Sequence, residues 1–176
     1  MLSLSRRELI RTGIAGSALL ALAACTRSNA PNAFDDSAYR YRALSPADRE
    51  LIGAVGAAML AGALPTGTDH RAALVQVVRG VDVAMSGLTP HVVTELHQLF
   101  GLLEFPPARA IAAGVWSDWS RASPRDVVRF LTRWRFSGVA LYRNGYQALH
   151  QLVMAAWYGH AASWSAIDYP GPPRLS

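Results

Sequence analysis

The sequence predicts an all-α protein, a single-domain bundle of about five or six helices. Pairs of a hydroxyl residue and a proline, which favour a helix start, occur at Ser45-Pro46, Thr89-Pro90 and Ser123-Pro124. Between these pairs, apolar residues recur with the three- to four-residue spacing of helices. The two-residue alternation that marks strands is absent from the sequence. Together these features favour a helical bundle over a mixed fold.

The first three helices follow from these starts. A helix from Pro46 to near Leu64 should stop before Pro65, and because it is apolar on nearly all sides we expect it to be the central buried helix. A second helix is predicted over Asp69–Met85, with an apolar stripe of leucine and valine. A third is predicted over Pro90–Leu103.

The second half of the domain is less regular. Phe105–Pro107 breaks the chain, and a short helix is expected over Ala108–Trp119. From Ser123 to about Trp164 the pattern allows either one long helix or two halves hinged near Gly138 or Gly145.

Residues 1–25 have the order of a secretory leader. Positive residues come first, an uncharged apolar stretch from Thr12 to Ala24 follows, and small residues precede Cys25. The stretch is too short to span a bilayer comfortably. Arg6 and Arg7 are adjacent and resemble the twin-arginine signal, which exports proteins already folded. We therefore expect a periplasmic protein that uses the twin-arginine translocase.

Cys25 is the only cysteine of the chain. The sequence Leu22-Ala23-Ala24-Cys25 resembles a bacterial lipoprotein cleavage site, in which the cysteine takes the lipid and becomes the new N-terminus. This predicts a membrane anchor through lipid, and the alternative is a leader cut after a small residue without lipid. With no further cysteine, the domain forms no internal disulfide, as suits a chain that folds before export.

The remaining chain divides by composition. Residues 26–44 are polar and aperiodic, which predicts a tether. The helical domain is then expected over residues 45–168, and residues 169–176, rich in proline and glycine, form an extended tail. The net charge is +5, of which the leader supplies +2, and the modest remainder does not indicate a nucleic-acid partner.

The sequence predicts no catalytic, cofactor or metal site in this chain. Metal ligands on one helix need a spacing that places them on the same face, and the five histidines do not have it. Those histidines are His70, His91, His97, His150 and His160. The acidic residues are scattered, and several of them stand at helix starts, where the helix dipole favours a negative charge.

The C-terminal third carries the candidate docking residues. Arg125, Arg129 and Arg133 recur every four residues and form a basic ridge, with Trp134 beside it. The ridge is either a solvated helix face or a docking surface, since arginine and tryptophan are enriched at interface hot spots. The tail residues Trp164, Tyr169, Pro170, Gly171 and Pro172 form either a frayed end or a strap for a partner groove.

Three stretches resemble the gluconate 2-dehydrogenase subunit 3 family: Leu44–Arg49, the helix end at Leu64-Pro65, and Trp164–Pro172. The resemblance implies a small helical subunit that accompanies a flavin-dependent glucose–methanol–choline oxidoreductase, with or without a cytochrome c subunit. FAD would belong to the partner and not to this chain. The predicted function is a non-catalytic escort that supplies the export signal and stabilises the catalytic subunit. The alternative is a stand-alone periplasmic lipoprotein with a structural or cofactor-binding role.

Overall fold

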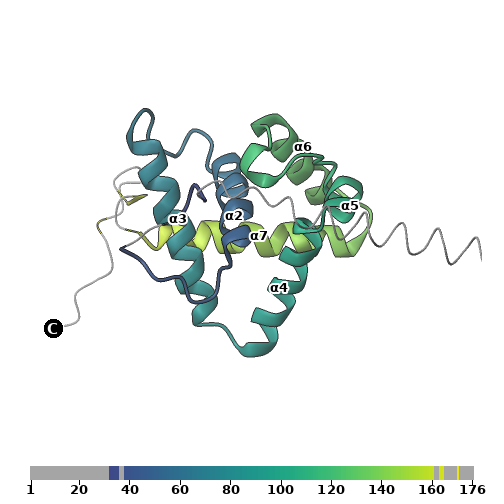
Figure 1. Cartoon of the computed structure of the whole chain (residues 1–176), viewed down its shortest axis with the longest axis horizontal. Coiled ribbons are helices and arrows are strands. Elements are labelled where there is room, and N and C mark those ends of the chain that lie inside the picture. Colours follow the sequence, from purple (N-terminus) through teal and green to yellow (C-terminus); the bar gives the residue numbers. More distant parts are fainter. Residues whose placement is uncertain (1–31, 36–37, 161–162, 165–169, 171–176) are drawn as a thin grey trace, which may run out of the picture. The chain divides into compact units, whose positions relative to one another are not determined.

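The computed structural model describes residues 32–35, 38–160, 163–164 and 170. The predicted all-α fold is confirmed, because these residues form six α-helices and no strand (Figure 1). The leader, with Arg6, Arg7 and Cys25, lies outside the described residues. The helices are α2 (Pro46–Met59), α3 (Asp69–Ser86), α4 (Pro90–Glu104), α5 (Pro106–Ala108), α6 (Pro124–Arg135) and α7 (Ala140–Tyr158).

The predicted helix starts occur at the expected residues. Ser45 caps α2, because its hydroxyl accepts a hydrogen bond from the backbone N–H of Asp48 at 3.1 Å. The Asp48 carboxylate accepts in return from the backbone N–H of Ser45 at 2.7 Å, which completes a capping box. The Ser123 hydroxyl caps α6 by accepting a hydrogen bond from the backbone N–H of Asp126 at 3.2 Å. Thr89 precedes α4 without a side-chain capping hydrogen bond.

Two of the predicted helix ends are displaced where a glycine adopts a left-handed conformation. The first helix ends at Met59 and does not reach Leu64, because the chain turns at Leu60 and Gly62 adopts a left-handed conformation with φ of 87°. The second difference follows α5, where a π-helical turn ends at Ala113, well short of Trp119. Gly114, with φ of 67°, reverses the chain there.

Of the two alternatives for the C-terminal tract, the hinged one is correct. Helix α6 ends at Arg135, and α7 begins at Ala140 after a turn that contains Gly138. Helix α7 ends at Tyr158, earlier than predicted. Beyond it Trp164 folds back, because its Nε1 donates a hydrogen bond to the carbonyl oxygen of Tyr158 at 2.9 Å.

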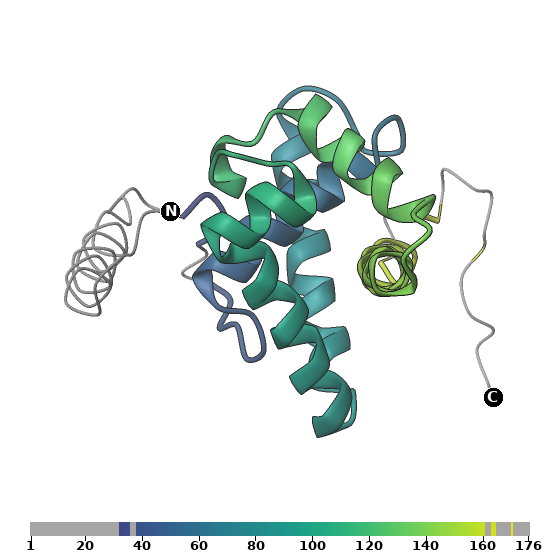
Figure 2. The same ribbon diagram turned by 90° about the vertical axis from the view of Figure 1, so that its right-hand side faces the viewer.

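Helix α7 lies across the bundle and packs against α2, α3 and α6 (Figure 1). Turned by 90°, the structure shows α7 end-on, with α6 beside it (Figure 2). Helix α2 contacts α3, α4, α6 and α7, and its Leu51, Ile52 and Val55 are fully buried. The prediction that this helix is central is therefore confirmed.

Helices α3 and α7 cross at Gly80. A methyl group at this glycine would lie 2.9 Å from Cβ and 3.1 Å from Cα of Ala156. We expect Gly80→Ala to lower the free energy of unfolding by about 2 kcal/mol, because backbone atoms of α7 would have to move. Chemical denaturation measures this change.

Gly101 of α4 provides the matched control. No heavy atom lies within 4 Å of a methyl group placed there. Gly101→Ala should therefore raise the free energy of unfolding by up to about 1 kcal/mol, through helix propensity alone. Equal stabilities of the two variants would contradict the close approach of α3 and α7.

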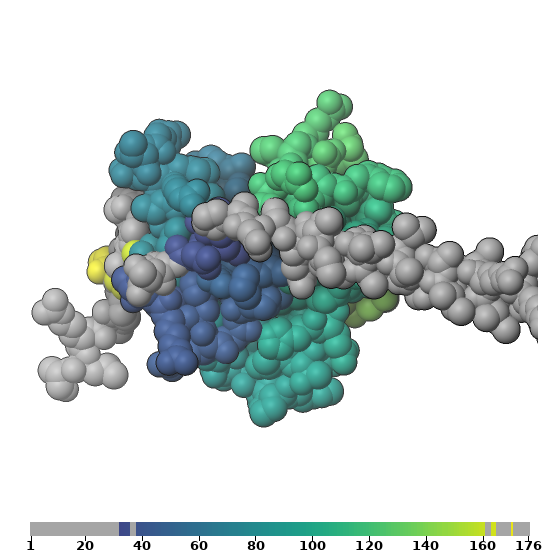
Figure 3. Space-filling model, viewed as in Figure 1, coloured from purple at the N-terminus to yellow at the C-terminus, as the bar shows by residue number. Residues whose placement is uncertain are grey.

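The described residues between 32 and 44 were predicted to be part of a tether, but they belong to the folded domain. These residues, 32–35 and 38–44, are here named the N-terminal strap, and they lie against the helices (Figure 3). Phe34 and Leu44 are buried, and the Phe34 ring occupies the space that a side chain at Gly53 would fill. Arg49 of α2 pairs with Asp35 at 2.6 Å. The folded domain therefore begins near residue 32 and not at residue 45.

Asp82 of α3 binds the N-terminal strap. This carboxylate is completely buried, and it accepts hydrogen bonds from the backbone N–H groups of Arg42, Ala43 and Leu44 at 2.8 to 3.1 Å. The Tyr39 hydroxyl donates to it at 2.9 Å. The pKa of Tyr39 is raised. The larger cause is burial of the side chain, and the second cause is this hydrogen bond to Asp82. A polar segment is thus ordered by one buried acceptor group.

Candidate partner-binding surface

The predicted basic ridge on α6 is divided in the structure. All three arginines are exposed, but they have different partners. Arg129 pairs with Asp126 at 2.9 Å on the same helix. Arg133 donates through Nη2 to the carbonyl oxygen of Ala112, in the π-helical turn. Arg125 stands in the first turn of α6, at the opposite end from Arg133.

Trp134 is a core residue, which corrects its assignment as a docking residue. Its side chain is 1% exposed, and Nε1 donates to the carbonyl oxygen of Ala112 at 2.9 Å. The indole stacks on Tyr142 with ring centroids 5.2 Å apart, and Phe130 meets it edge-on at 4.8 Å. The absence of a side chain at Gly145 leaves room for the indole. A partner cannot reach this side chain in the folded domain.

The tail residues are only partly within the described chain. Trp164 is half-buried, and Pro170 is exposed. Tyr169, Gly171 and Pro172 lie outside the described residues, so the strap or frayed end predicted for the tail stays a prediction.

The structure instead exposes a different group of apolar side chains. Trp116 is 84% exposed and Ile111 is 81% exposed, in and after the π-helical turn. Phe136 and Leu141 are 74% and 67% exposed, and Val139 lies between them in the turn from α6 to α7. Soluble proteins rarely keep large apolar side chains together in water unless the surface binds something.

The two loops that carry these side chains adjoin. The carbonyl oxygen of Ala112 accepts hydrogen bonds from both Arg133 and Trp134, at the C-terminal end of α6. Trp134 in turn stacks on Tyr142, in the first turn of α7. The view in Figure 2 looks onto this end of the bundle, where the turn after α5 lies beside α6.

Arginines accompany the apolar residues. The guanidinium of Arg135 lies over the Phe136 ring, 5.2 Å from its centroid. Arg143 Nη1 donates to the carbonyl oxygen of Ser137 at 2.6 Å. We name the combined surface the basic–apolar face. It consists of Ile111, Trp116, Phe136, Val139 and Leu141 with Arg133, Arg135 and Arg143.

Sequence reasoning missed this face, although a signal was present. Turns are usually polar, yet Ile111 and Trp116 lie within three residues of Gly114, and Phe136 and Val139 lie within two residues of Gly138. At a turn some apolar side chains are left uncovered, as Ile111 and Trp116 are, while Val115 between them is buried. Such residues are therefore candidates for an exposed binding surface.

No protein-family model, no curated protein and no solved structure matches this chain. The resemblance to the gluconate 2-dehydrogenase subunit 3 family stays a prediction.

Asp118 fixes the loop that follows Trp116. Its carboxylate pairs with Arg121 at 2.8 Å and with Arg109 at 3.1 Å. The hydrogen bond from Arg121 is the main reason that the pKa of Asp118 is lowered, with a further contribution from the charge of Arg109 against the opposing effect of burial. The ion pairs therefore hold the loop at neutral pH and weaken when acid protonates this carboxylate.

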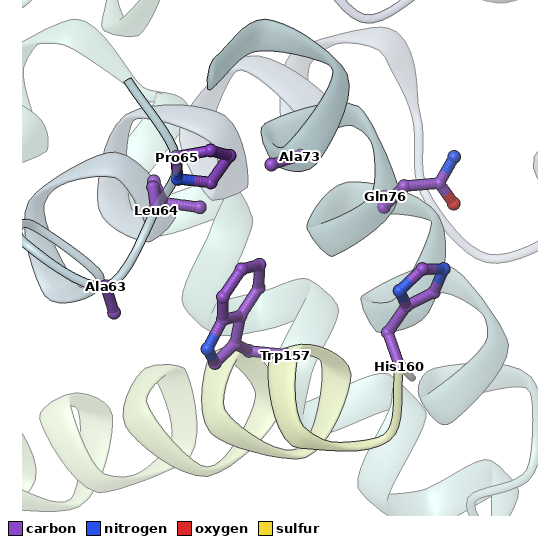
Figure 4. Close-up of a pocket in the computed structure, with 7 residues that line it drawn as sticks. All are labelled: Ala63, Leu64, Pro65, Ala73, Gln76, Trp157 and His160. Carbon is purple, nitrogen blue, oxygen red and sulfur yellow. The ribbon is translucent and has the colours of Figure 1, made fainter. Parts of the chain in front are cut away.

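The pockets of the described chain are shallow and largely apolar. A pocket of about 250 Å³ lies between the loop after α2, helix α3 and the end of α7, with the Trp157 ring on one side (Figure 4). A larger groove of about 570 Å³ follows α2, where Gly53, Ala54, Ala57 and Ala58 leave space. His160 lines the smaller pocket, and Glu50 and His70 are among the residues that line the larger groove.

The histidines are separately placed. His97 Nε2 lies 2.9 Å from the carbonyl oxygen of Ala43, and His91 lies 3.4 Å from the Glu95 carboxylate. Among the residues that the structure describes, no three His, Cys, Asp or Glu side chains are placed to hold a metal ion. No helix within the described ranges is long and apolar enough to cross a membrane.

Proposed function

We propose that this protein is a non-catalytic small subunit that binds and escorts the catalytic subunit of an exported flavin-dependent oxidoreductase. In this role it supplies the twin-arginine leader and stabilises its partner, which carries the FAD. The partner lacks a leader and crosses the membrane as part of the folded complex.

The observation that carries the proposal is the basic–apolar face. Five large apolar side chains, each more than half exposed, lie in the segments 111–116 and 136–141, and hydrogen bonds from Arg133 and Trp134 to Ala112 bring these segments close to each other. Covering them with a partner removes apolar surface from water, which stabilises both chains. The leader and the family resemblance of the sequence indicate what kind of partner this is.

Co-expression tests the proposal. The chain is produced together with a flavin-dependent oxidoreductase that lacks a leader and is encoded beside it, and the large subunit carries the affinity tag. We expect the periplasmic fraction to contain both chains in one complex, with the visible absorbance of bound flavin.

The matched variants are Arg6→Lys/Arg7→Lys in the leader and Arg40→Lys in the exposed part of the N-terminal strap. The leader variant should hold both chains in the cytoplasm, and the strap variant should export them normally. A large subunit that reaches the periplasm with the leader variant contradicts the escort role. So does a small subunit that is recovered from the periplasm without any flavoprotein, a result that favours the stand-alone lipoprotein.

A further inference from the structure

We propose that the basic–apolar face recognises an acidic surface on its partner, in which carboxylates surround an apolar centre. The inference rests on the proposed function and names the chemistry of the surface that the partner presents.

Positive charge is unevenly distributed along the described chain. Residues 105–145 contain seven arginines and two aspartates, a net charge of +5. The other described residues contain five arginines and seven carboxylates, a net charge of −2. Positive charge is therefore concentrated in the part of the chain that forms the basic–apolar face.

Carboxylates of the described residues do not neutralise the arginines of the basic–apolar face. The two aspartates of the segment, Asp118 and Asp126, both pair with arginines outside the face. Within the described residues, Arg133, Arg135 and Arg143 have no carboxylate partner. An acidic partner would supply the missing negative charge, and complementary charges also favour the correct encounter.

The three guanidinium groups of the face are each held by a contact within the chain. Arg133 and Arg143 each donate to a backbone carbonyl oxygen, and Arg135 lies over an aromatic ring. A guanidinium has five N–H donors in one plane, so donors remain for a carboxylate after one such bond is made. Binding then costs less side-chain entropy than it would for mobile cations.

These features favour a protein partner over an anionic lipid surface. Tryptophan, phenylalanine and arginine are the residue types enriched at protein interfaces, and Trp116 and Phe136 are exposed aromatic side chains of the face. Fixed guanidinium groups suit carboxylates at defined positions. A lipid surface has mobile headgroups and attracts any nearby cation without a defined register.

The test uses the complex of the full chain with its flavoprotein and a pair of variants with equal changes of charge. Arg135→Glu/Arg143→Glu reverses two charges of the face. Arg40→Glu/Arg71→Glu reverses two exposed charges outside it. Circular dichroism verifies folding, and the Kd of each complex is measured at low and high salt.

We expect the face variant to raise the Kd by about 100-fold at low salt, whereas the control variant stays near the wild-type value. Binding of the wild-type chain should weaken as salt increases. An unchanged Kd for the face variant overturns this inference alone. Equal weakening by the control variant also overturns it, because the effect would then reflect only net charge.

Vesicles of phosphatidylglycerol and phosphatidylethanolamine test the lipid surface directly. Cosedimentation of the wild-type chain with these vesicles, lost in the face variant while the flavoprotein complex keeps its Kd, would assign the face to lipid and overturn the inference. A wild-type chain that binds no flavoprotein overturns the proposed function and this inference together. The two failures are therefore distinguishable.

Discussion

Replacing Asp82 by alanine is expected to lower the free energy of unfolding by about 4 kcal/mol, because one buried and three partly buried donors then lose the acceptor that they bond to. Three backbone N–H groups of the N-terminal strap and the Tyr39 hydroxyl bond to this carboxylate. A backbone N–H that is buried without a partner costs more than a lost contact, since it had a water partner in the unfolded chain. Chemical denaturation followed by circular dichroism measures the change.

Asp69→Ala on the same helix is the matched control. Asp69 is exposed in the first turn of α3, where its charge interacts only with the helix dipole. Its loss should cost less than about 1 kcal/mol. Asp82→Asn should fall between the two alanine variants, because its amide oxygen still accepts while its NH2 group faces donors. Similar stabilities for Asp82→Ala and Asp69→Ala would refute the ordering role of Asp82.

The second large effect on stability is expected at Trp134, and Trp116 is its control. Trp134→Ala should lower the free energy of unfolding by about 4 kcal/mol, because it leaves a cavity in the core and removes the hydrogen bond to Ala112. Trp116→Ala should change it by less than about 0.5 kcal/mol, since the side chain is 84% exposed. The same denaturation experiment compares the two variants.

Binding of the partner by the folded protein should depend on Trp116, although the stability of the fold does not. Trp116→Ala is expected to weaken the complex with the flavoprotein by about 2 kcal/mol, as an aromatic anchor at the centre of an interface does. A fully stable Trp116→Ala variant that binds the partner as tightly as the wild type would exclude this residue from the interface. A Trp134→Ala variant of wild-type stability would contradict its place in the core.

The helices could be predicted because their signals are local. A hydroxyl residue followed by proline starts a helix through atoms within four residues, as Ser45 and Asp48 do. The helix ends were predicted less well. Gly62 and Gly114 adopt left-handed conformations there, and nothing in the apolar pattern distinguishes them from the glycines that continue a helix.

The candidate site could be predicted only in outline. The arginine-rich and tryptophan-rich segment does carry the basic–apolar face, but Trp134 is buried, whereas Trp116, which was not among the predicted docking residues, is exposed. A helical pattern gives the angle between side chains on one helix. It does not say which face of that helix meets a neighbouring helix.

The sequence by itself determined the fold class, the helix starts and the concentration of arginine in the second half of the chain, since these depend on near neighbours and on composition. Only the tertiary structure decided the order of the N-terminal strap, because its polar backbone is satisfied by a carboxylate about 40 residues away. It also decided which aromatic side chains are covered. Burial depends on which surfaces meet when the helices pack, and that is a property of the whole bundle.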